Sequence, residues 1–584
     1  MKLTERIQER ISRAVAKCCG DAPEPLKIGA PPNAALGDMA VECFALAKRF
    51  KKSPAALAAE IAPFIDADDL IEAAAATGPY INITLKARGY FGYTCREMFD
   101  ALPFRKGPAA SGDRMMVEYL SPNTNKPLHL GHMRNGALGM AVANLHAATG
   151  KDVVKANLVN DRGVHICKSM LAWQRWGEGA TPESTGRKGD TFVGDWYIRF
   201  AKEADKNPSL EEEAQAMLRR WEQGDQEILD IWKKMNQWVY DGFAETYRKL
   251  NLLFDVFYYE SQTYTLGKEI IEEGIAKGVF TKDQAGNTIF ALQPDRFGLD
   301  EKGEPKRVTV LRPDGTSLYV SQDIGTTVLK VSEQKLSRCI FVVGSEQQFH
   351  FKCLFAILEG LGYPWAKDCH HLSYGMVYLP EGKMKSREGK IVDADDLIES
   401  MTDLAAEEIR SRDQEGLLSP GEIRERAAKI GAGAIKFYLL RVKPTQDIHF
   451  DPRESISFDG FTGPYCQYAY ARICGIIRKA RERGIDDGKA THALLGNPEE
   501  RLLAGQLMRF PETVGKAAEE HNPSLVAIYL FDTAKLFNQF YNKHSVINAE
   551  EAPLQADRLS LTVATAEVLK KGLELLNIEV LERM

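Results

Sequence analysis

MMVEYLSPNTNKPLHLGH, residues 115–132, is an apolar run that passes directly into a polar loop rich in proline, asparagine and histidine. The run 115–120 has the length and composition of a buried strand, and residues 133–148 have the apolar spacing of a helix that stops before Gly150. A second apolar run, VVKANLV (153–159), follows. This order is typical of a βαβ unit. We therefore expect a parallel sheet with the loop at the carboxyl ends of its strands, where open α/β sheets bind ligands.

The loop places His129, Gly131 and His132 at the start of the expected helix. Free backbone N–H groups and the helix dipole favour phosphate at such a position, and two imidazoles three residues apart can donate to its oxygens. Gly131 would let a purine or a ribose approach the backbone. Two surface histidines near a helix start are the alternative interpretation. The chain has no G-x-x-x-x-G-K-[ST] motif, so we expect a nucleotide site of another kind than a P-loop.

The periodicity of the sequence divides the chain into four regions. We predict boundaries at 1–105, 106–395, 396–460 and 461–584. The first region reads as a small α/β domain with helices at 3–19 and 39–50 and a strand at 80–85, and a Pro/Gly/Ser-rich linker at 102–113 ends it.

The second region continues the βαβ pattern with a strand at 339–344 and a helix at 347–360. Between about 180 and 300 the sequence is helical, aromatic and charged, which predicts a helical insertion between two halves of one parallel sheet. From residue 396 onward the apolar spacing is almost wholly helical, first as a connector and then as a bundle.

Composition sets broad limits on the function. The 584 residues are 44% hydrophobic and 27% charged, as in soluble globular proteins, and the net charge of −6 argues against nucleic-acid binding over the whole surface while allowing local basic patches. The ten cysteines form no Cys-x-x-Cys pair, so we expect free thiols and no bound zinc or other structural metal. No signal-peptide core and no long apolar run occur, so we expect a cytoplasmic protein without a membrane partner.

Residues 118–139, EYLSPNTNKPLHLGHMRNGALG, resemble the HIGH signature region of class I arginyl-tRNA synthetases. The form S-P-N-x-x-K-x-x-H-x-G-H is characteristic of that member of the class, and the resemblance covers essentially the whole chain. It implies an α/β protein: a class I Rossmann-type parallel-sheet catalytic domain with a helical insertion, an N-terminal small α/β domain and a C-terminal all-α anticodon-binding bundle.

A second signature lies about 250 residues downstream, in GMVYLPEGKMKSREGKIVDADDL (375–397). It resembles the KMSKS loop, whose lysines neutralise charge on the β- and γ-phosphates as pyrophosphate leaves. Lys383 and Met384 fit the motif, but Lys385 stands where the family has Ser, and Ser386 stands where the second lysine belongs. Taken alone, the segment is a charged surface loop.

The resemblance implies that Lys126, in the first signature, supplies the charge that is missing at Ser386. Lys385, displaced by one residue, is the alternative. The predicted catalytic residues are Lys126, His129, His132, Lys383 and Lys385. The predicted ATP-binding residues are Pro122, His129, Gly131, His132, Met384 and Ser386.

Selective recognition of arginine requires carboxylates, because a guanidinium presents a planar fork of donors. Glu118 ends the first strand beside the loop, and Asn123 in the loop is placed for the α-amino or carboxylate group. Tyr319 and Asp323 are four residues apart and share a helical face, while Gln347 follows a strand at the ligand edge. The resemblance maps arginine binding onto the same five positions, each of which is more often structural when considered alone.

Aromatic and basic residues alternate in FTGPYCQYAYARICGIIRKARERG (461–484), the combination that binds single-stranded loops by stacking and phosphate contacts. The segment resembles the opening of the family's anticodon-binding domain, and we predict tRNA contacts at Tyr465, Tyr468 and Arg472. An amphipathic helix with tyrosines in its core is the alternative. The N-terminal region resembles the family's tRNA-elbow domain, and no contact residues are assigned there.

The reaction implied by the resemblance has two steps. Arginine attacks the α-phosphate of ATP, supplied with Mg²⁺, to give arginyl-adenylate and pyrophosphate, and the tRNA(Arg) 3′ end then accepts the arginyl group. The expected partners are ATP, L-arginine and tRNA(Arg), and we expect the protein to be a monomer. Members of this family commonly require bound tRNA before they activate arginine. Two other interpretations remain: a different enzyme of the same superfamily, or a catalytically inactive tRNA-binding paralogue, which the displaced lysine favours.

Overall fold

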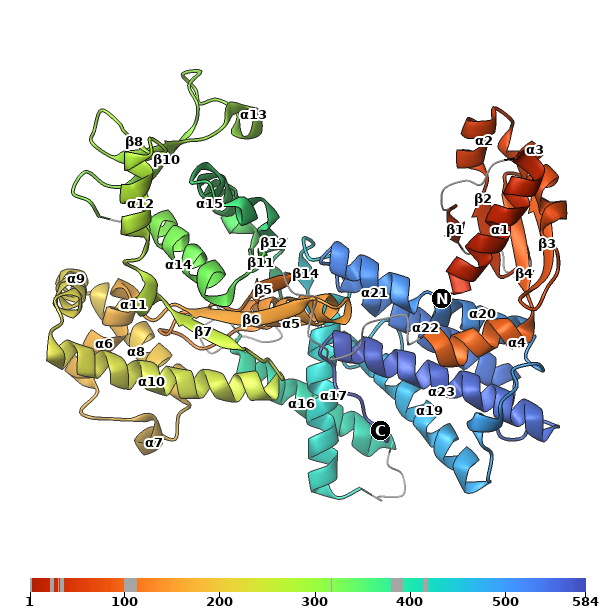
Figure 1. The fold of residues 1–584 in the computed structure, drawn as a ribbon. Coiled ribbons are helices and arrows are strands. Elements are labelled where there is room, and N and C mark those ends of the chain that lie inside the picture. The colour runs from red at the N-terminus through yellow and green to blue at the C-terminus, as the bar shows by residue number, and fades with distance from the viewer. Residues whose placement is uncertain are drawn as a thin grey trace.

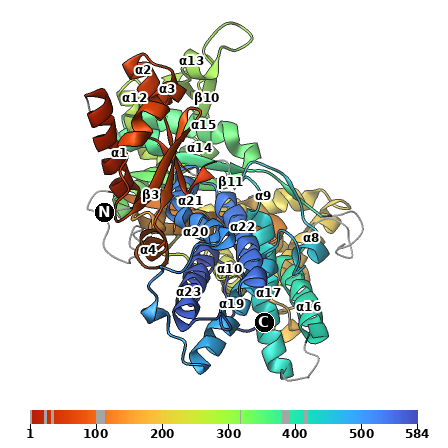
Figure 2. The ribbon, with the colours of Figure 1, turned by 90° about the vertical axis from the view of Figure 1, so that its right-hand side faces the viewer.

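Three structural units follow one another along the chain (Figure 1). The computed structural model describes residues 3–20, 26–29, 31, 36–98, 113–316, 318–379, 392–412 and 418–584. A small α/β domain is followed by a larger α/β domain around a central sheet, and then by a helical bundle. Figure 2, which faces the bundle, shows the small domain above it, and Figure 1 shows that this domain lies away from the central sheet.

The central sheet has five parallel strands in the order β12-β11-β5-β6-β7. In that order their bounds are His370–Tyr374, Arg338–Gly344, Arg114–Glu118, Asp152–Val159 and Val256–Tyr259. The predicted parallel sheet and its βαβ unit are therefore confirmed. Because parallel strands end at one edge, the segments that follow Glu118, Val159, Tyr259 and Gly344 gather at that edge.

The two faces of the sheet enter different hydrophobic cores. Met115 and Val117 of β5 pack with α5 (Leu130–Ala148) in one core, while Met116 between them faces the other core. That second core is covered by α14 (Tyr319–Gln334) and α15 (Gln348–Gly360). Burial on both faces explains why the three central residues of β5 are all apolar.

Close packing between α5 and the end of β5 depends on two glycines. A Cβ at Gly139 would lie 2.2 Å from Cγ and 2.3 Å from Cβ of Tyr119, and a Cβ at Gly136 would lie 2.8 Å from a methyl group of Leu252. The helix therefore approaches the sheet closely only because these positions lack side chains.

The region between about 180 and 300 is more varied than predicted. Helices do fill its first half: α7 (Pro182–Thr185), α8 (Gly189–Ala204), α9 (Ser209–Glu222) and α10 (Gln226–Lys249), after α6 (Val164–Trp176). The prediction of one helical insertion was wrong beyond residue 255, because β7 is an edge strand of the central sheet. Four residues at a sheet edge are too short to show a clear period.

A second insertion follows β7. It contains the short helices α11 (Glu260–Thr263), α12 (Gly267–Ala276) and α13 (Pro294–Phe297), and an antiparallel sheet of β8 (Thr281–Lys282), β9 (Thr288–Ala291) and β10 (Arg307–Leu311). This sheet rises beside α12 in Figure 1.

The N-terminal domain has four antiparallel strands in the order β1-β2-β4-β3. Its elements are α1 (Leu3–Cys19), β1 (Ile28–Gly29), β2 (Met39–Glu42), α2 (Phe44–Phe50), α3 (Pro54–Ile61), β3 (Ile71–Thr77), β4 (Tyr80–Leu85) and α4 (Ala87–Gly92). The predicted helix at 3–19 and strand at 80–85 are confirmed. The predicted helix at 39–50 was wrong in its first five residues: the helix begins at Phe44, because Met39 and Val41 pair with Ile83 and Ile81 of β4.

The C-terminal part is helical, as predicted. Its helices are α16 (Ala394–Arg412), α17 (Pro420–Leu440), α18 (Pro452–Ser455), α19 (Gly463–Glu482), α20 (Pro498–Met508), α21 (Phe510–Glu519), α22 (Ser524–Lys543) and α23 (Ala552–Leu575). One short parallel pair, β13 (Val377–Tyr378) with β14 (Ile448–His449), joins it to the larger α/β domain. Arg501 of α20 donates to both carboxylate oxygens of Asp38, at 2.9 and 2.7 Å, and so holds the N-terminal domain on the bundle.

In the part of the chain that the structure describes, no helix is both long and apolar enough to cross a membrane.

The glycine at position 139 provides a test of the packing between α5 and β5. We expect Gly139→Ala to lower the free energy of unfolding by about 1–3 kcal/mol, because the new methyl group overlaps the Tyr119 ring. Gly421→Ala is the matched control, since a Cβ there meets nothing within 4 Å. Urea unfolding followed by circular dichroism measures both, and equal midpoints for the two variants would contradict the expectation.

Candidate active site

The first signature loop is fixed by main-chain contacts on both sides. It leaves β5 through two left-handed residues, Leu120 (φ 77°) and Ser121 (φ 45°). Asn160, just after β6, then pairs with the loop: its N–H donates to the Pro122 carbonyl at 3.0 Å, and its carbonyl accepts from Thr124 at 3.1 Å. Asn123 forms a β-bridge with Asn160 and is thereby held at the carboxyl edge of the sheet.

The two signature histidines form the N-terminal cap of α5. The His129 Nδ1 accepts from the Gly131 N–H at 3.1 Å, and the His132 Nδ1 accepts from the His129 N–H at 3.1 Å. The ring centroids lie 3.9 Å apart. Since each Nδ1 accepts a hydrogen bond, each neutral ring carries its proton on Nε2 and can donate it to a ligand.

Burial keeps both imidazoles neutral. It lowers the pKa of His129 to about 4, and the positive charge of Lys126 adds to this effect. The pKa of His132 is also well below its usual range, because of burial, His129 and Lys126. Lys126 thus lies close enough for its charge to act on both rings.

Gly131 has a local reason to be glycine. A Cβ there would lie 3.0 Å from Cε1 and 3.1 Å from Nδ1 of His129. The missing side chain therefore makes room for the His129 ring, in addition to the predicted approach of a ligand.

The four predicted residues of the second signature lie outside the described residues: Lys383, Met384, Lys385 and Ser386. The described residues on both sides of this segment contact the first signature. Asp393 forms a β-bridge with His129, and the Ala394 N–H donates to the Leu128 carbonyl at 2.8 Å. On the other side, Arg134 of α5 donates to the Gly375 carbonyl at 2.9 Å and the Met376 carbonyl at 3.1 Å.

The predicted arginine-binding residues are only partly brought together. Tyr319 begins α14 with 77% of its surface exposed, and Asp323 lies one turn further, with its Oδ2 2.6 Å from Nε2 of His350. Gln347 is exposed directly before α15. Glu118 does not fit the prediction as it stands, because its carboxylate pairs with the ammonium group of Lys330 and only 6% of the residue is exposed.

A polar cavity of about 410 Å³ borders Tyr319 at the ligand edge. Its lining residues are Asn160, Arg162, Gly163, Val164, His165, Gln215, Leu218, Glu260, Arg312, Leu318, Tyr319 and Gln322. They follow β6, β7 and β10 or lie on α6, α9 and α14.

Glu260 is the functional candidate that sequence reasoning missed. Burial raises the pKa of its carboxyl to about 7, Arg162 opposes the shift, and the charges of Asp323 and Asp161 add to it. Glu260 lines the cavity beside Tyr319, and the charge of Asp323 acts on it from outside the lining. Its position directly after a strand was the available signal, but β7 itself was not predicted.

Asp161 and Arg162 hold the residues around Glu260 in place. The buried Asp161 carboxylate accepts from the Ser261 N–H at 2.8 Å, the Ser261 hydroxyl at 2.7 Å and the Tyr240 hydroxyl at 3.0 Å, which fixes the residue next to Glu260. Arg162 donates to Glu222 at 2.7 Å and lies 3.9 Å from the centroid of Tyr264.

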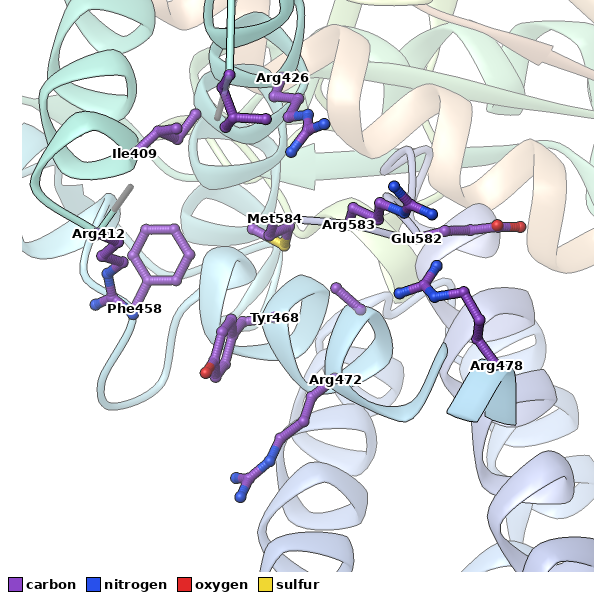
Figure 3. Close-up of a pocket in the computed structure, with 12 residues that line it drawn as sticks. Ile409, Arg412, Arg426, Phe458, Tyr468, Arg472, Arg478, Glu582, Arg583 and Met584 are labelled. Carbon is purple, nitrogen blue, oxygen red and sulfur yellow. The ribbon is translucent and has the colours of Figure 1, made fainter. Parts of the chain in front are cut away.

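A second cavity, of about 420 Å³, lies in the helical bundle (Figure 3). Its lining contains five arginines and the last three residues of the chain: Ile409, Arg412, Leu418, Arg426, Phe458, Tyr468, Ala471, Arg472, Arg478, Glu582, Arg583 and Met584. The local charge is strongly positive although the chain is acidic overall.

Two of the three predicted tRNA-binding residues line this second cavity. Tyr468 is 38% exposed, and the Arg472 Nη1 donates to Asn538 at 3.3 Å. Tyr465 packs in the bundle instead, with its ring centroid 5.3 Å from that of Phe531 and its hydroxyl accepting from Asn538 at 3.0 Å. For Tyr465, the alternative of a tyrosine in the core describes the structure better.

Among the described residues, no group of three or more His, Cys, Asp or Glu side chains could hold a metal ion. All ten cysteines are free thiols.

Comparison with known proteins covers each unit of the chain. Residues 105–452 match the model of the catalytic domain of the "tRNA synthetases class I (R)", residues 466–584 match the "DALR anticodon binding domain", and residues 5–85 match the "Arginyl tRNA synthetase N terminal domain".

Relatives and solved structures agree with these models. An arginine–tRNA ligase of Treponema denticola is 44% identical over 96% of this chain and 95% of its own length, and one of Porphyromonas gingivalis is 40% identical over the whole of both chains. The arginyl-tRNA synthetase of Thermus thermophilus superposes with a TM-score of 0.83 at 29% identity, covering all of both chains. With its two signatures joined at the carboxyl edge of the sheet, the chain belongs to the class I arginyl-tRNA synthetase family.

Proposed function

We propose that this chain activates L-arginine with Mg-ATP, forming arginyl-adenylate and pyrophosphate, and transfers the arginyl group to the 3′ end of tRNA(Arg). The observation that carries the proposal is the contact between the two signature regions, where the main chain of Asp393 forms a β-bridge with that of His129. We further propose that the protein acts as a monomer. The protein supplies position and charge rather than a covalent intermediate.

For the nucleotide, we propose that the Nε2–H groups of His129 and His132 donate to phosphate or ribose oxygens. Their low pKa values keep them neutral donors at any pH near 7. Lys126 supplies the positive charge for the triphosphate, together with Lys383 and Lys385, while Pro122, Gly131, Met384 and Ser386 border the nucleotide. Lys126 acts electrostatically on both histidines, which supports its place near the phosphates.

For the amino acid, we propose that the guanidinium lies between the carboxylates of Asp323 and Glu260, with Tyr319 beside it. Asn123 and Gln347 hold the α-amino and carboxylate groups. Glu118 is given no direct contact, because Lys330 already neutralises it. Two carboxylates suit the bidentate geometry of a guanidinium and leave lysine, which has a single ammonium, less well bound.

For the tRNA, we propose that the arginine-lined cavity of the bundle receives part of the anticodon loop. Tyr468 offers a stacking surface, and Arg412 and Arg472 offer phosphate contacts. We also propose that the N-terminal domain, held on the bundle by the Asp38–Arg501 pair, contacts the tRNA elbow.

ATP–pyrophosphate exchange with each amino acid, with and without tRNA(Arg), tests the proposed function. We expect exchange with arginine, and Lys126→Ala should slow it by at least two orders of magnitude while tRNA still binds in a filter assay, because charge on the leaving pyrophosphate is less stabilised. Lys151→Ala is the control, since Lys151 pairs with Asp113 at the opposite edge of the sheet. Exchange with another amino acid only, or near-normal exchange by Lys126→Ala, would overturn the respective claim.

The carboxyl of Glu260 predicts a pH dependence of arginine binding. With a pKa of about 7, it is half protonated near neutrality, and only the ionised form attracts a guanidinium. The KM for arginine should therefore fall several-fold between pH 6 and pH 8. Glu260→Gln should raise the KM about 10- to 100-fold, as for a lost charged hydrogen bond, and abolish this pH dependence. An unchanged pH profile in the variant would exclude Glu260 from the guanidinium site.

A further inference from the structure

The chain after α23 has no regular secondary structure, yet its course is closely determined. Asn577, the second residue after the helix, adopts a left-handed conformation (φ 58°) and is 5% exposed. Ile578 and Leu581 are buried at 1% and 8% exposure. The segment 577–584, called the tail below, ends in the arginine-lined cavity, where Glu582, Arg583 and Met584 are visible in Figure 3.

Asn577 is the point at which the tail meets two other parts of the molecule. Its side-chain Nδ2 donates to the carbonyls of Leu250 at 3.2 Å and Asn251 at 3.0 Å, and its Oδ1 accepts from the Asn251 Nδ2 at 3.0 Å. Its main-chain carbonyl accepts from the buried ammonium of Lys436 on α17 at 2.7 Å. The side chain thus makes its bonds to the catalytic domain, and the main chain makes its bond to the bundle.

The contacts of the tail reach both sites described above, the one around Glu260 and the arginine-lined cavity. Leu250 and Asn251 lie between α10 and β7, and Glu260 follows β7 directly. On the other side, the Glu579 carbonyl accepts from the buried Gln467 Nε2 at 2.7 Å, and Gln467 is the neighbour of Tyr468 on α19. A short stretch of irregular chain therefore spans from the turn before β7 to the wall of the cavity.

We propose that Asn577 is a positioning residue for tRNA: it seats the tail as one wall of the arginine-lined cavity and fixes that wall relative to the catalytic domain. This proposal rests on the proposed role of the cavity in binding tRNA. An irregular segment keeps one conformation only if specific bonds offset its chain entropy, and the side chain of Asn577 supplies three of the hydrogen bonds that hold the tail.

Asn577→Gly removes the amide and keeps the left-handed backbone free of strain. We expect the KM for tRNA in aminoacylation to rise about tenfold, because the cavity wall is no longer fixed. The KM values for arginine and ATP, measured at saturating tRNA, should stay within twofold of the parent chain, which a general loss of structure would not allow. Asn548→Gly is the matched control, since its amide accepts from Arg483 at another surface of the bundle.

Asn251→Gly tests the same contact from the catalytic side. It removes only the Nδ2 bond to Asn577, so its effect on the KM for tRNA should be smaller. The double variant should match Asn577→Gly alone, because the bond that Asn251 donates is already lost there. Additive effects in the double variant would overturn the inference.

Tyr468→Ala separates this inference from the proposal on which it rests. If Tyr468→Ala leaves the KM for tRNA unchanged, the cavity does not bind tRNA and both proposals fail. If Tyr468→Ala raises it but Asn577→Gly does not, only the positioning role fails. If Asn577→Gly proves unstable, the KM for tRNA of Asn251→Gly decides, and no change there would reject the role.

Discussion

Arg134 donates four hydrogen bonds to main-chain carbonyls, those of Gly375, Met376, Pro444 and Gln446, from a side chain with no solvent exposure. Burial lowers the pKa of this guanidinium to about 10, so it remains charged at neutral pH. A buried cation is costly unless its donors are satisfied, and these carbonyls satisfy four of them. The same bonds join α5 to the residues just before β13 and just before β14, so one side chain holds the first signature helix against the segment between α17 and α18.

Local hydrophobic periodicity was sufficient to predict the strands and the helix that surround Arg134. The strands at 153–159 and 339–344 and the helix at 133–148 follow from apolar runs that are long and unambiguous. The helix at 39–50 was wrong at its start because strand pairing with β4, some forty residues away, overrides the local preference of Met39–Glu42. β7 was missed because its length is below what a period can reveal.

The candidate site divides in the same way. His129, His132 and Lys126 lie within one loop, and their spacing already defines a chemistry. The roles of Glu118 and Glu260 depend on partners distant in sequence. The sequence around Glu118 does not predict its contact with Lys330, 212 residues downstream. The sequence around Glu260 likewise does not predict the influence of Asp323 on its carboxyl. The sequence therefore indicates that carboxylates bind the guanidinium, but the choice of Glu260 over Glu118 requires the folded structure.

The cap that His129 and His132 form has a consequence for the thermodynamics of ligand binding. Both rings are held by hydrogen bonds to the backbone before any ligand arrives. Few rotamers remain to be frozen when phosphate binds, so the entropic penalty of ordering these two side chains is met during folding rather than during association. The first turn of α5 is therefore preorganised, and its histidines belong at once to the architecture of the helix and to the affinity of the site.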